Sequence, residues 1–185
     1  MSTFYKTTIP TFRNIASSAI SFLTTAKEEQ SKNEALPSDE EVLNSQLGDM
    51  LPFRVQPTLI AKFQLGPLEA TKPSATAPSL DPSSFKSLDD VIDFFKKLIA
   101  FIDSVDEKAW NESAQKSLDV EVAGKTLHMT SIEDHVTSFV VPNSYFHLNT
   151  MYMLLRMTGF TLGKSKYIGP FMSEQANKDW APLRG

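Results

Sequence analysis

Apolar side chains recur at three- and four-residue steps in several stretches of this 185-residue chain. In the first stretch they are Ile9, Phe12, Ala16, Ala19, Ile20 and Leu23. In a later stretch they are Leu88, Val91, Ile92, Phe95, Leu98, Ile99 and Ile102. Because an α-helix completes a turn in about 3.6 residues, each set lines one helix face that neighbours must cover. The pattern predicts an all-α fold, an antiparallel-type bundle of four principal helices.

Capping and helix-breaking residues define the second helix. Residues 38–41 read Ser-Asp-Glu-Glu, a capping box in which the serine hydroxyl accepts from the amide of the second glutamate, whose carboxylate reaches back. Gly48 and Pro52 then interrupt the pattern, so we expect a kink or two abutting segments up to about Lys62. Residues 66–84 are rich in Pro, Ser, Thr and Ala, which predicts a long surface loop.

A period-two pattern precedes the last helix. Within residues 117–130, apolar and polar side chains alternate on both sides of Ala123-Gly124, which predicts a short β-hairpin. The last helical region opens after Thr130, is expected to be divided by Pro142, and ends at Gly159. We expect residues 1–185 to form one domain.

The amino-acid composition argues against several classes of function. The net charge is -4 and the basic residues are scattered, which argues against nucleic-acid binding. No apolar run approaches the ~18 residues that span a bilayer, so no membrane association is expected. The chain has no cysteine, which excludes disulfides and thiolate chemistry and fits a cytoplasmic protein. The first 27 residues contain no acidic residue and so resemble an organelle-targeting peptide. We favour a bundle helix for this segment, because the bundle would otherwise have one helix too few.

The candidate site lies on the last helix, in residues 142–156. His147 stands beside Tyr145, with Thr150 one turn further on, and an imidazole can take or give a proton near neutral pH. A buried histidine that is satisfied by a carbonyl or by the Thr150 hydroxyl explains the same pattern equally well. The side chains of Asp49, Phe53 and Gln56 share a face of the second helix and are the expected partners.

The three histidines suggest a metal site, but their spacing is poor. His135 and His147 are twelve residues apart, about 18 Å along an unbroken helix, and His128 falls in the predicted hairpin. Met151 occupies the place four residues after His147 where a second imidazole would complete a pair. We expect no metal and no other cofactor.

Phe94 and Phe101 widen the apolar face of the third helix. They are expected either to cover a neighbouring helix or to contact a partner subunit, and the first alternative is favoured.

Residues 142–150, Pro-Asn-Ser-Tyr-Phe-His-Leu-Asn-Thr, carry a family resemblance. Together with Leu154-Leu155-Arg156, Gly159 and Gly163-Lys164, they resemble the signature of a microbial family, domain of unknown function nineteen-ninety-three. Residues 46–52, Gln56, Tyr5 and Pro10 extend the resemblance over nearly the whole chain.

That family belongs to the DinB/YfiT-like superfamily of four-helix proteins, whose better-known members carry metal on three histidines and are often dimers. The resemblance implies a DinB-like bundle with the hairpin inserted before the last helix. His147 matches the signature histidine, and Asp49 and Gln56 match polar positions of helix two. The metal triad does not carry over, because helix two lacks its histidine and the last helix keeps only His147, followed by Met151.

We therefore expect a pocket for a small organic ligand between helix two and the last helix. His147 and Asp49 are the catalytic candidates, and the binding candidates are Gln56, Phe53, Tyr145, Thr150, Met151 and Asn143. One hypothesis is a metal-independent isomerase, lyase or cyclase of specialised metabolism in which His147 is the acid or base and Asp49 orients it. A second is a non-catalytic binding or homodimerisation module that uses Phe94 and Phe101. A third, from the resemblance, is a divalent-metal-dependent transferase or hydrolase.

Overall fold

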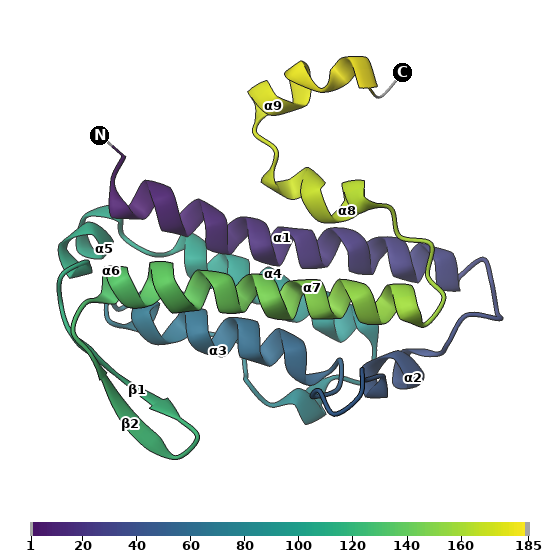
Figure 1. Cartoon of the computed structure of the whole chain (residues 1–185), viewed down its shortest axis with the longest axis horizontal. Coiled ribbons are helices and arrows are strands. Elements are labelled where there is room, and N and C mark those ends of the chain that lie inside the picture. The colour runs from purple at the N-terminus through teal and green to yellow at the C-terminus, as the bar shows by residue number, and fades with distance from the viewer. Residues whose placement is uncertain (1, 184–185) are drawn as a thin grey trace.

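Four long helices form the body of the protein in a computed structural model that describes residues 2–183. They are α1 (Phe4–Gln30), α3 (Val55–Glu69), α4 (Leu88–Asp103) and α7 (Val141–Met157). Helix α1 packs against α4 and α7, and α7 packs against α3, so the four lie side by side (Figure 1). The predicted all-α bundle with an inserted hairpin is confirmed.

Helix α1 begins where Thr3 caps it, with the side chain accepting from the Lys6 amide. The predicted stripe faces the core: Ile9, Phe12, Ala16, Ala19 and Leu23 are buried, while Ile20 is half-buried beside them. The apolar stripe therefore places this segment as the first helix of the bundle.

The second helical region is two separate helices. Helix α2 (Asp39–Asn44) begins at the predicted capping box, where the Glu41 carboxylate accepts from the Ser38 amide at 2.7 Å. A loop over residues 45–54 contains Gly48 at φ +57°, a left-handed conformation that favours glycine, and α3 starts at Val55. Because α3 continues to Glu69, the prediction that the loop starts at residue 66 is wrong.

Burial explains the longer helix. Leu65 and Leu68 are buried in the core, and Pro67 is tolerated inside α3 between them. The real connection covers residues 70–87 and includes a 3-10 turn, Pro82–Ser84. It is anchored by Phe85, whose buried ring meets that of Phe94 at 5.3 Å between centroids.

Helix α4 buries the two phenylalanines that widen its apolar face. Phe94 is 5% exposed and Phe101 is 3% exposed within the chain's own core. The alternative in which they form a working surface for a partner is therefore wrong, and they cover neighbouring elements instead.

The hairpin lies within its predicted residues. After the short helix α5 (Glu107–Ser113), strand β1 (Leu118–Val122) pairs antiparallel with β2 (Lys125–Met129). The turn residues Ala123 and Gly124 have φ of 51° and 73°, as a two-residue hairpin turn requires.

Pro142 does not divide the last helical region. Helix α6 (Ile132–His135) passes into a π-helical turn, Val136–Val140, which joins α7 directly. The π turn lies directly before Pro142, where a regular helix would bring the proline ring against the carbonyl four residues earlier. We call the continuous helical stretch of residues 132–157 the long helical run.

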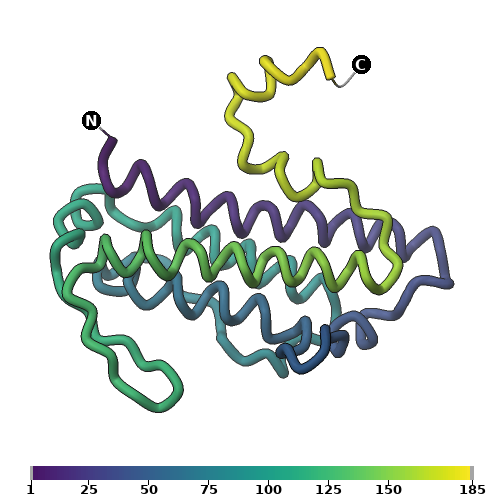
Figure 2. The backbone as a smooth tube through the Cα atoms, in the orientation of Figure 1, coloured from purple at the N-terminus to yellow at the C-terminus, as the bar shows by residue number. Residues whose placement is uncertain are grey.

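After α7, Gly159 at φ +107° turns the chain, as predicted. Helix α8 (Lys164–Ile168) and a 3-10 turn, Gly169–Phe171, pack against α1. Helix α9 (Glu174–Asp179) and a last 3-10 turn, Ala181–Leu183, lead away from the bundle (Figure 2). Among residues 2–183, no helix is long and apolar enough to cross a membrane.

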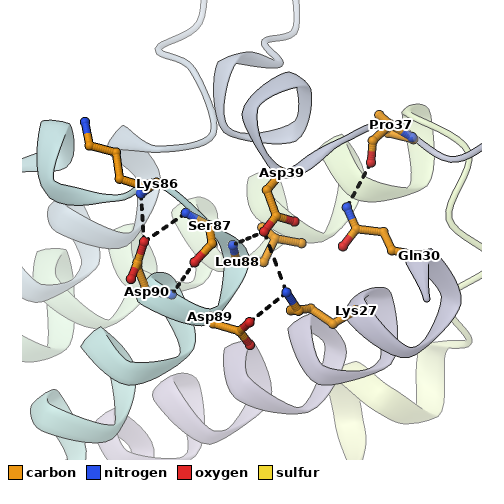
Figure 3. A network of polar contacts seen from close by, with 9 residues as sticks. All are labelled: Lys27, Gln30, Pro37, Asp39, Lys86, Ser87, Leu88, Asp89 and Asp90. Carbon is orange, nitrogen blue, oxygen red and sulfur yellow. Dashed lines mark hydrogen bonds and ion pairs between the residues drawn. The ribbon is translucent and has the colours of Figure 1, made fainter. Parts of the chain in front are cut away.

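A polar network ties three helices together at one end of the bundle (Figure 3). Lys27 of α1 lies 2.7 Å from Asp89 of α4 and 3.6 Å from Asp39 of α2. Asp39 also accepts from the Leu88 amide at 3.1 Å. The start of α4 is therefore held by both α1 and α2.

Removing the cap of α4 should weaken this end of the fold. Ser87 accepts from the Asp90 amide, and Asp90 accepts from the Ser87 amide in return (Figure 3). We expect Ser87→Ala to lower the free energy of unfolding by about 1 kcal/mol, because one helix-end amide loses its acceptor. Ser87→Thr, which keeps the hydroxyl, is the control. Urea denaturation measures both, and equal stability of the alanine variant would show that this cap does not matter.

Candidate functional site

His147 is held by a single buried partner. Its Nδ1 lies 2.7 Å from Oε1 of Gln56, which comes from the first turn of α3. The Gln56 side chain is 1% exposed and that of His147 is 9% exposed. The Gln56 amide nitrogen donates to the carbonyl of Leu51 at 2.6 Å. The pair therefore joins α7, α3 and the loop that precedes α3.

This arrangement fixes where the imidazole proton lies. The Leu51 carbonyl oxygen can only accept a hydrogen bond, so the side-chain NH2 of Gln56 must face Leu51. The Oε1 of Gln56 must then face the imidazole ring. Nδ1 of His147 then carries the proton and donates it to Gln56. Burial lowers the pKa of His147 to about 4, so the ring is neutral at pH 7. Nε2 keeps its lone pair, and no hydrogen bond from residues 2–183 reaches it.

A second polar pair lies along the same interface. Gln64 of α3 donates to the Ser144 hydroxyl of α7 at 3.2 Å, and both side chains are fully buried. Among residues 2–183, four buried side-chain polar atoms have no hydrogen-bond partner: Arg54 Nε, Gln64 Oε1, His135 Nε2 and Asn143 Nδ2.

All of these residues belong to α3, to its N-cap or to the long helical run. We call the set the polar seam: Arg54, Gln56, Gln64, His135, Asn143, Ser144 and His147. Buried polar groups normally find partners, so unpaired ones indicate water or a ligand.

An apolar groove lies between α7 and the loop that precedes α3. It has a volume of about 380 Å³ and is lined by Leu47, Met50, Phe146, Asn149, Thr150, Met153, Leu154 and Met157. Leu47, Phe146, Met153 and Met157 are each more than half exposed. None of the described residues that line the groove carries a charge, and its polar groups are the Asn149 amide and the Thr150 hydroxyl.

Phe146 connects the groove to the histidine. Its ring lines the groove and meets the His147 ring edge-on, with centroids 5.2 Å apart. Thr150 also lines the groove, and its hydroxyl donates to the Phe146 carbonyl at 2.9 Å, which leaves its oxygen free to accept. Phe146 is therefore the contact between the groove lining and His147 of the seam.

The structure brings only some of the predicted site residues together. His147 and Gln56 are paired, and Thr150 lines the groove. Phe53 and Met151 are fully buried in the core and do not line the groove.

The remaining predicted residues lie elsewhere. The Tyr145 ring is half-buried against Phe171, 5.7 Å between centroids, and burial raises its pKa. Asn143 belongs to the seam through its unpaired Nδ2. Asp49 is exposed in the loop, and Gln56 holds the atom that Asp49 was expected to orient. The orienting role therefore passes from Asp49 to Gln56.

Sequence reasoning missed the outward face of α7. Phe146, Met153 and Met157 recur at seven- and four-residue steps, opposite the core-facing Leu148, Met151 and Leu155. The sequence does contain a signal for this outward face, because the residues of α7 are apolar on two opposite faces of the helix. Gln64 and Ser144 were also missed, because their pairing is visible only once α3 and α7 are placed together.

The residues present do not fit a catalytic metal. His147 offers one nitrogen, because its Nδ1 is bound to Gln56. His135 is buried against the Phe139 ring, and His128 lies on the hairpin, 2.7 Å from Asp119. Among the described residues there is no group of three or more His, Asp or Glu side chains that could hold a metal ion. A stable site for a divalent ion needs about three such ligands.

The fold defines the class of protein. It is similar to the crystal structure of a DinB family member protein from Shewanella denitrificans, with a TM-score of 0.69 and 21% sequence identity. The similarity covers 89% of this chain and 91% of that one. The search of curated proteins found no match.

The family follows from the sequence. Residues 4–168 match the family described as Domain of unknown function (DUF1993). The chain belongs to this family, as the resemblance predicted, and its fold is that of a DinB-like bundle.

The neutral state of His147 should make stability depend on pH. In the unfolded chain its pKa returns to about 6.5, so between pH 6.5 and 4 the unfolded state binds a proton that the folded state excludes. Stability should therefore fall as the pH falls through this range. His135, whose pKa is also lowered by burial, contributes in the same direction.

We expect His147→Gln, which does not titrate, to reduce this dependence. Urea midpoints at several pH values from 7 to 4.5 measure it. An unchanged slope in the variant would show that His147 is not the group that excludes the proton.

The donor set also predicts the metal content. We expect the purified protein to hold far less than one zinc or nickel per chain after dialysis without chelator, because the site offers Nε2 of His147 and a stable site needs about three ligands. Elemental analysis measures it, with His147→Leu as the comparison. About one metal per chain, lost in that variant, would contradict the prediction.

Proposed function

We propose that the protein binds a small, uncharged, largely apolar organic molecule in the groove, and that Nε2 of His147 accepts a hydrogen bond or a proton from it. The observation that carries this proposal is the neutral imidazole fixed by Gln56, whose ring contacts Phe146 in the wall of an apolar groove and whose Nε2 receives no hydrogen bond from residues 2–183.

The lining supports the type of ligand. The groove volume falls in the range of small-molecule sites, and such sites combine apolar walls with a few polar groups. An ionised ligand would find no partner of opposite charge among the lining residues. The Asn149 amide and the Thr150 oxygen can orient a hydroxyl or a carbonyl on an apolar skeleton.

The chemistry that such a site can perform is proton transfer without a metal. When Nε2 accepts a proton, the other proton stays on Nδ1 and keeps its hydrogen bond to the Gln56 oxygen, and the ring becomes an imidazolium. Because its pKa is near 4, this imidazolium is a strong acid and returns the proton readily. Isomerase, lyase and cyclase reactions move protons in this way without a net redox change.

A second candidate is ligand binding without catalysis. No carboxylate and no lysine line the groove, so His147 would have to serve as both acid and base. If turnover exists, its rate should increase as His147 loses its proton and should disappear in His147→Gln. Ligand binding without any turnover would identify a binding protein.

Groove binding is tested with the uncharged dye Nile red. We expect saturable fluorescence enhancement at one site per chain, and we expect Met153→Glu to weaken binding at least about tenfold, because a charge then enters an apolar site. Leu127→Glu is the matched control, since Leu127 is an exposed apolar residue on the hairpin. Equal binding by both variants would remove the groove from the proposal.

The role of His147 is tested with naphthol and its methyl ether. We expect the wild type to bind naphthol about fivefold more tightly, because only the hydroxyl can donate to Nε2. The double variant His147→Leu with Gln56→Leu should lose this preference and still bind Nile red.

Stability provides the control for the double variant. His147→Leu alone leaves Gln56 Oε1 buried and unpaired, at a cost of about 1–3 kcal/mol. Replacing both partners is expected to cost less, because the Leu51 carbonyl that then loses its donor belongs to an exposed residue. A naphthol preference that persists in the folded double variant would contradict the role of His147.

A further inference from the structure

A concavity of about 450 Å³ lies between α8 and α9 and shares no lining residue with the groove (Figure 1). Among the described residues, its lining consists of Lys164, Ser165, Ile168, Phe171, Met172, Ala176 and Trp180. The match to the family ends at residue 168, so the last four of these residues lie beyond the part of the chain that defines the family. Neither the family nor the groove therefore accounts for this concavity.

One wall of the concavity is fixed to the bundle. The Phe171 ring packs against the rings of Tyr145 of α7 and Tyr167 of α8, with centroids 5.7 Å and 6.2 Å away, respectively. The Tyr167 carbonyl accepts a hydrogen bond from the Ser18 hydroxyl of α1 at 2.8 Å. This wall is therefore formed before any ligand binds, as in most small-molecule sites.

The opposite wall is α9, which contains several local polar contacts. Ser173 caps the helix by accepting from the Ala176 amide at 3.1 Å, and Gln175 donates to Asp179 at 2.7 Å. A helix of six residues is too short to be stable without tertiary packing. A ligand between the two walls would contact both α8 and α9 and supply part of that packing.

The polar side chains of the lining can all donate hydrogen bonds. They are the Lys164 ammonium, the Ser165 hydroxyl and the Trp180 indole N–H. None of these three side chains has an ion pair or a hydrogen-bond partner among residues 2–183. No acidic residue is among the described residues that line the concavity. The lining therefore offers one positive charge and two neutral donors beside apolar walls.

We propose that the concavity binds an organic monocarboxylate with a short alkyl or aromatic body. The carboxylate pairs with Lys164 and accepts from the Ser165 hydroxyl, while the body packs against Phe171 and Trp180. The volume of the concavity falls in the range of small-molecule sites.

Charge complementarity selects this class of ligand. An uncharged ligand would displace water from the Lys164 ammonium without replacing its hydrogen bonds, and a cation would be repelled by it. A phosphate dianion would bring a second negative charge for which the described lining has no partner. The site is independent of the proposed function, because the groove has other lining residues and takes an uncharged molecule.

Equilibrium dialysis of the full chain with phenylbutyrate tests the proposal, and phenylbutyramide has nearly the same shape without the charge. We expect one site per chain and about fivefold tighter binding of the acid, because the ion pair in an open concavity is partly screened by water. Lys164→Glu should remove this preference. Lys166→Glu makes the same change in charge on the same helix, at a residue that does not line the concavity, and should keep it.

The apolar part of the site has its own variants. Trp180→Ala should weaken the binding of the acid and of the amide about equally, because it removes contact area and no charge. Met153→Glu, which places a charge in the groove, should bind phenylbutyrate as the wild type does.

Tryptophan fluorescence gives a second measurement on the wild type. Trp110 is fully buried and donates to Thr8, whereas Trp180 is 58% exposed, so acrylamide quenches mainly Trp180. Phenylbutyrate should reduce this quenching at the concentrations at which it binds. Equal affinity for acid and amide, loss of the preference in Lys166→Glu, or unchanged quenching of Trp180 would each overturn the proposal. Binding to phosphatidylglycerol vesicles without binding of phenylbutyrate would overturn it as well.

Discussion

The hydrogen bond between Gln56 and His147 is the interaction on which the site depends. It fixes the tautomer of the imidazole, connects α7 to the start of α3 and, through Leu51, holds the loop that forms one wall of the groove. A typical hydrogen bond adds only about 0.5–1.5 kcal/mol to stability, and an unpaired buried polar atom costs about 1–3 kcal/mol. With Gln64 Oε1 and Asn143 Nδ2 left unpaired, the polar seam stabilises the fold less than leucines would. The stability of the fold therefore does not explain the polar seam, and this is why we propose a function for it.

The π turn at residues 136–140 determines which residues face the seam. In a regular helix, His135 and His147 would lie about 120° apart around the axis, because twelve residues exceed three turns by a third of a turn. A π turn holds one extra residue, so the downstream helix is rotated by about 100° and the two side chains come to within about 20°. His135 and His147 are both buried, as this rotation requires. The same turn admits Pro142 without a break in the long helical run.

Much of the fold could be predicted because its signals are local. The capping residues Ser38 and Ser87 and the positive-φ residue Gly159 mark helix ends through contacts within a few residues. Pro67 and Pro142 were misjudged for the opposite reason. Whether a helix tolerates proline depends on the burial of its neighbours and on a π turn, and neither is encoded in the nearest residues.

The candidate site was predictable only in part. His147 and Gln56 were identified from their polar character at inward positions, but their contact joins residues 91 positions apart and requires the packing of α3 on α7. Asp49 was assigned the orienting role, and Gln56 was expected to bind the ligand. The place of Asp49 in an exposed loop follows from the separation of α2 and α3, which the sequence left open as a kink or two segments.

The identity of the orienting residue changes the chemistry. A carboxylate beside Nδ1 would stabilise the imidazolium and raise the pKa of the ring, whereas a neutral amide accepts the same hydrogen bond without adding charge. Burial then dominates, and His147 stays unprotonated through the physiological range. Nε2 is consequently an acceptor well above pH 4, and in the proposed function the ligand supplies the proton that they share. An uncharged molecule with a hydroxyl group or an enol fits this requirement, and the apolar groove next to Phe146 fits the rest of such a molecule.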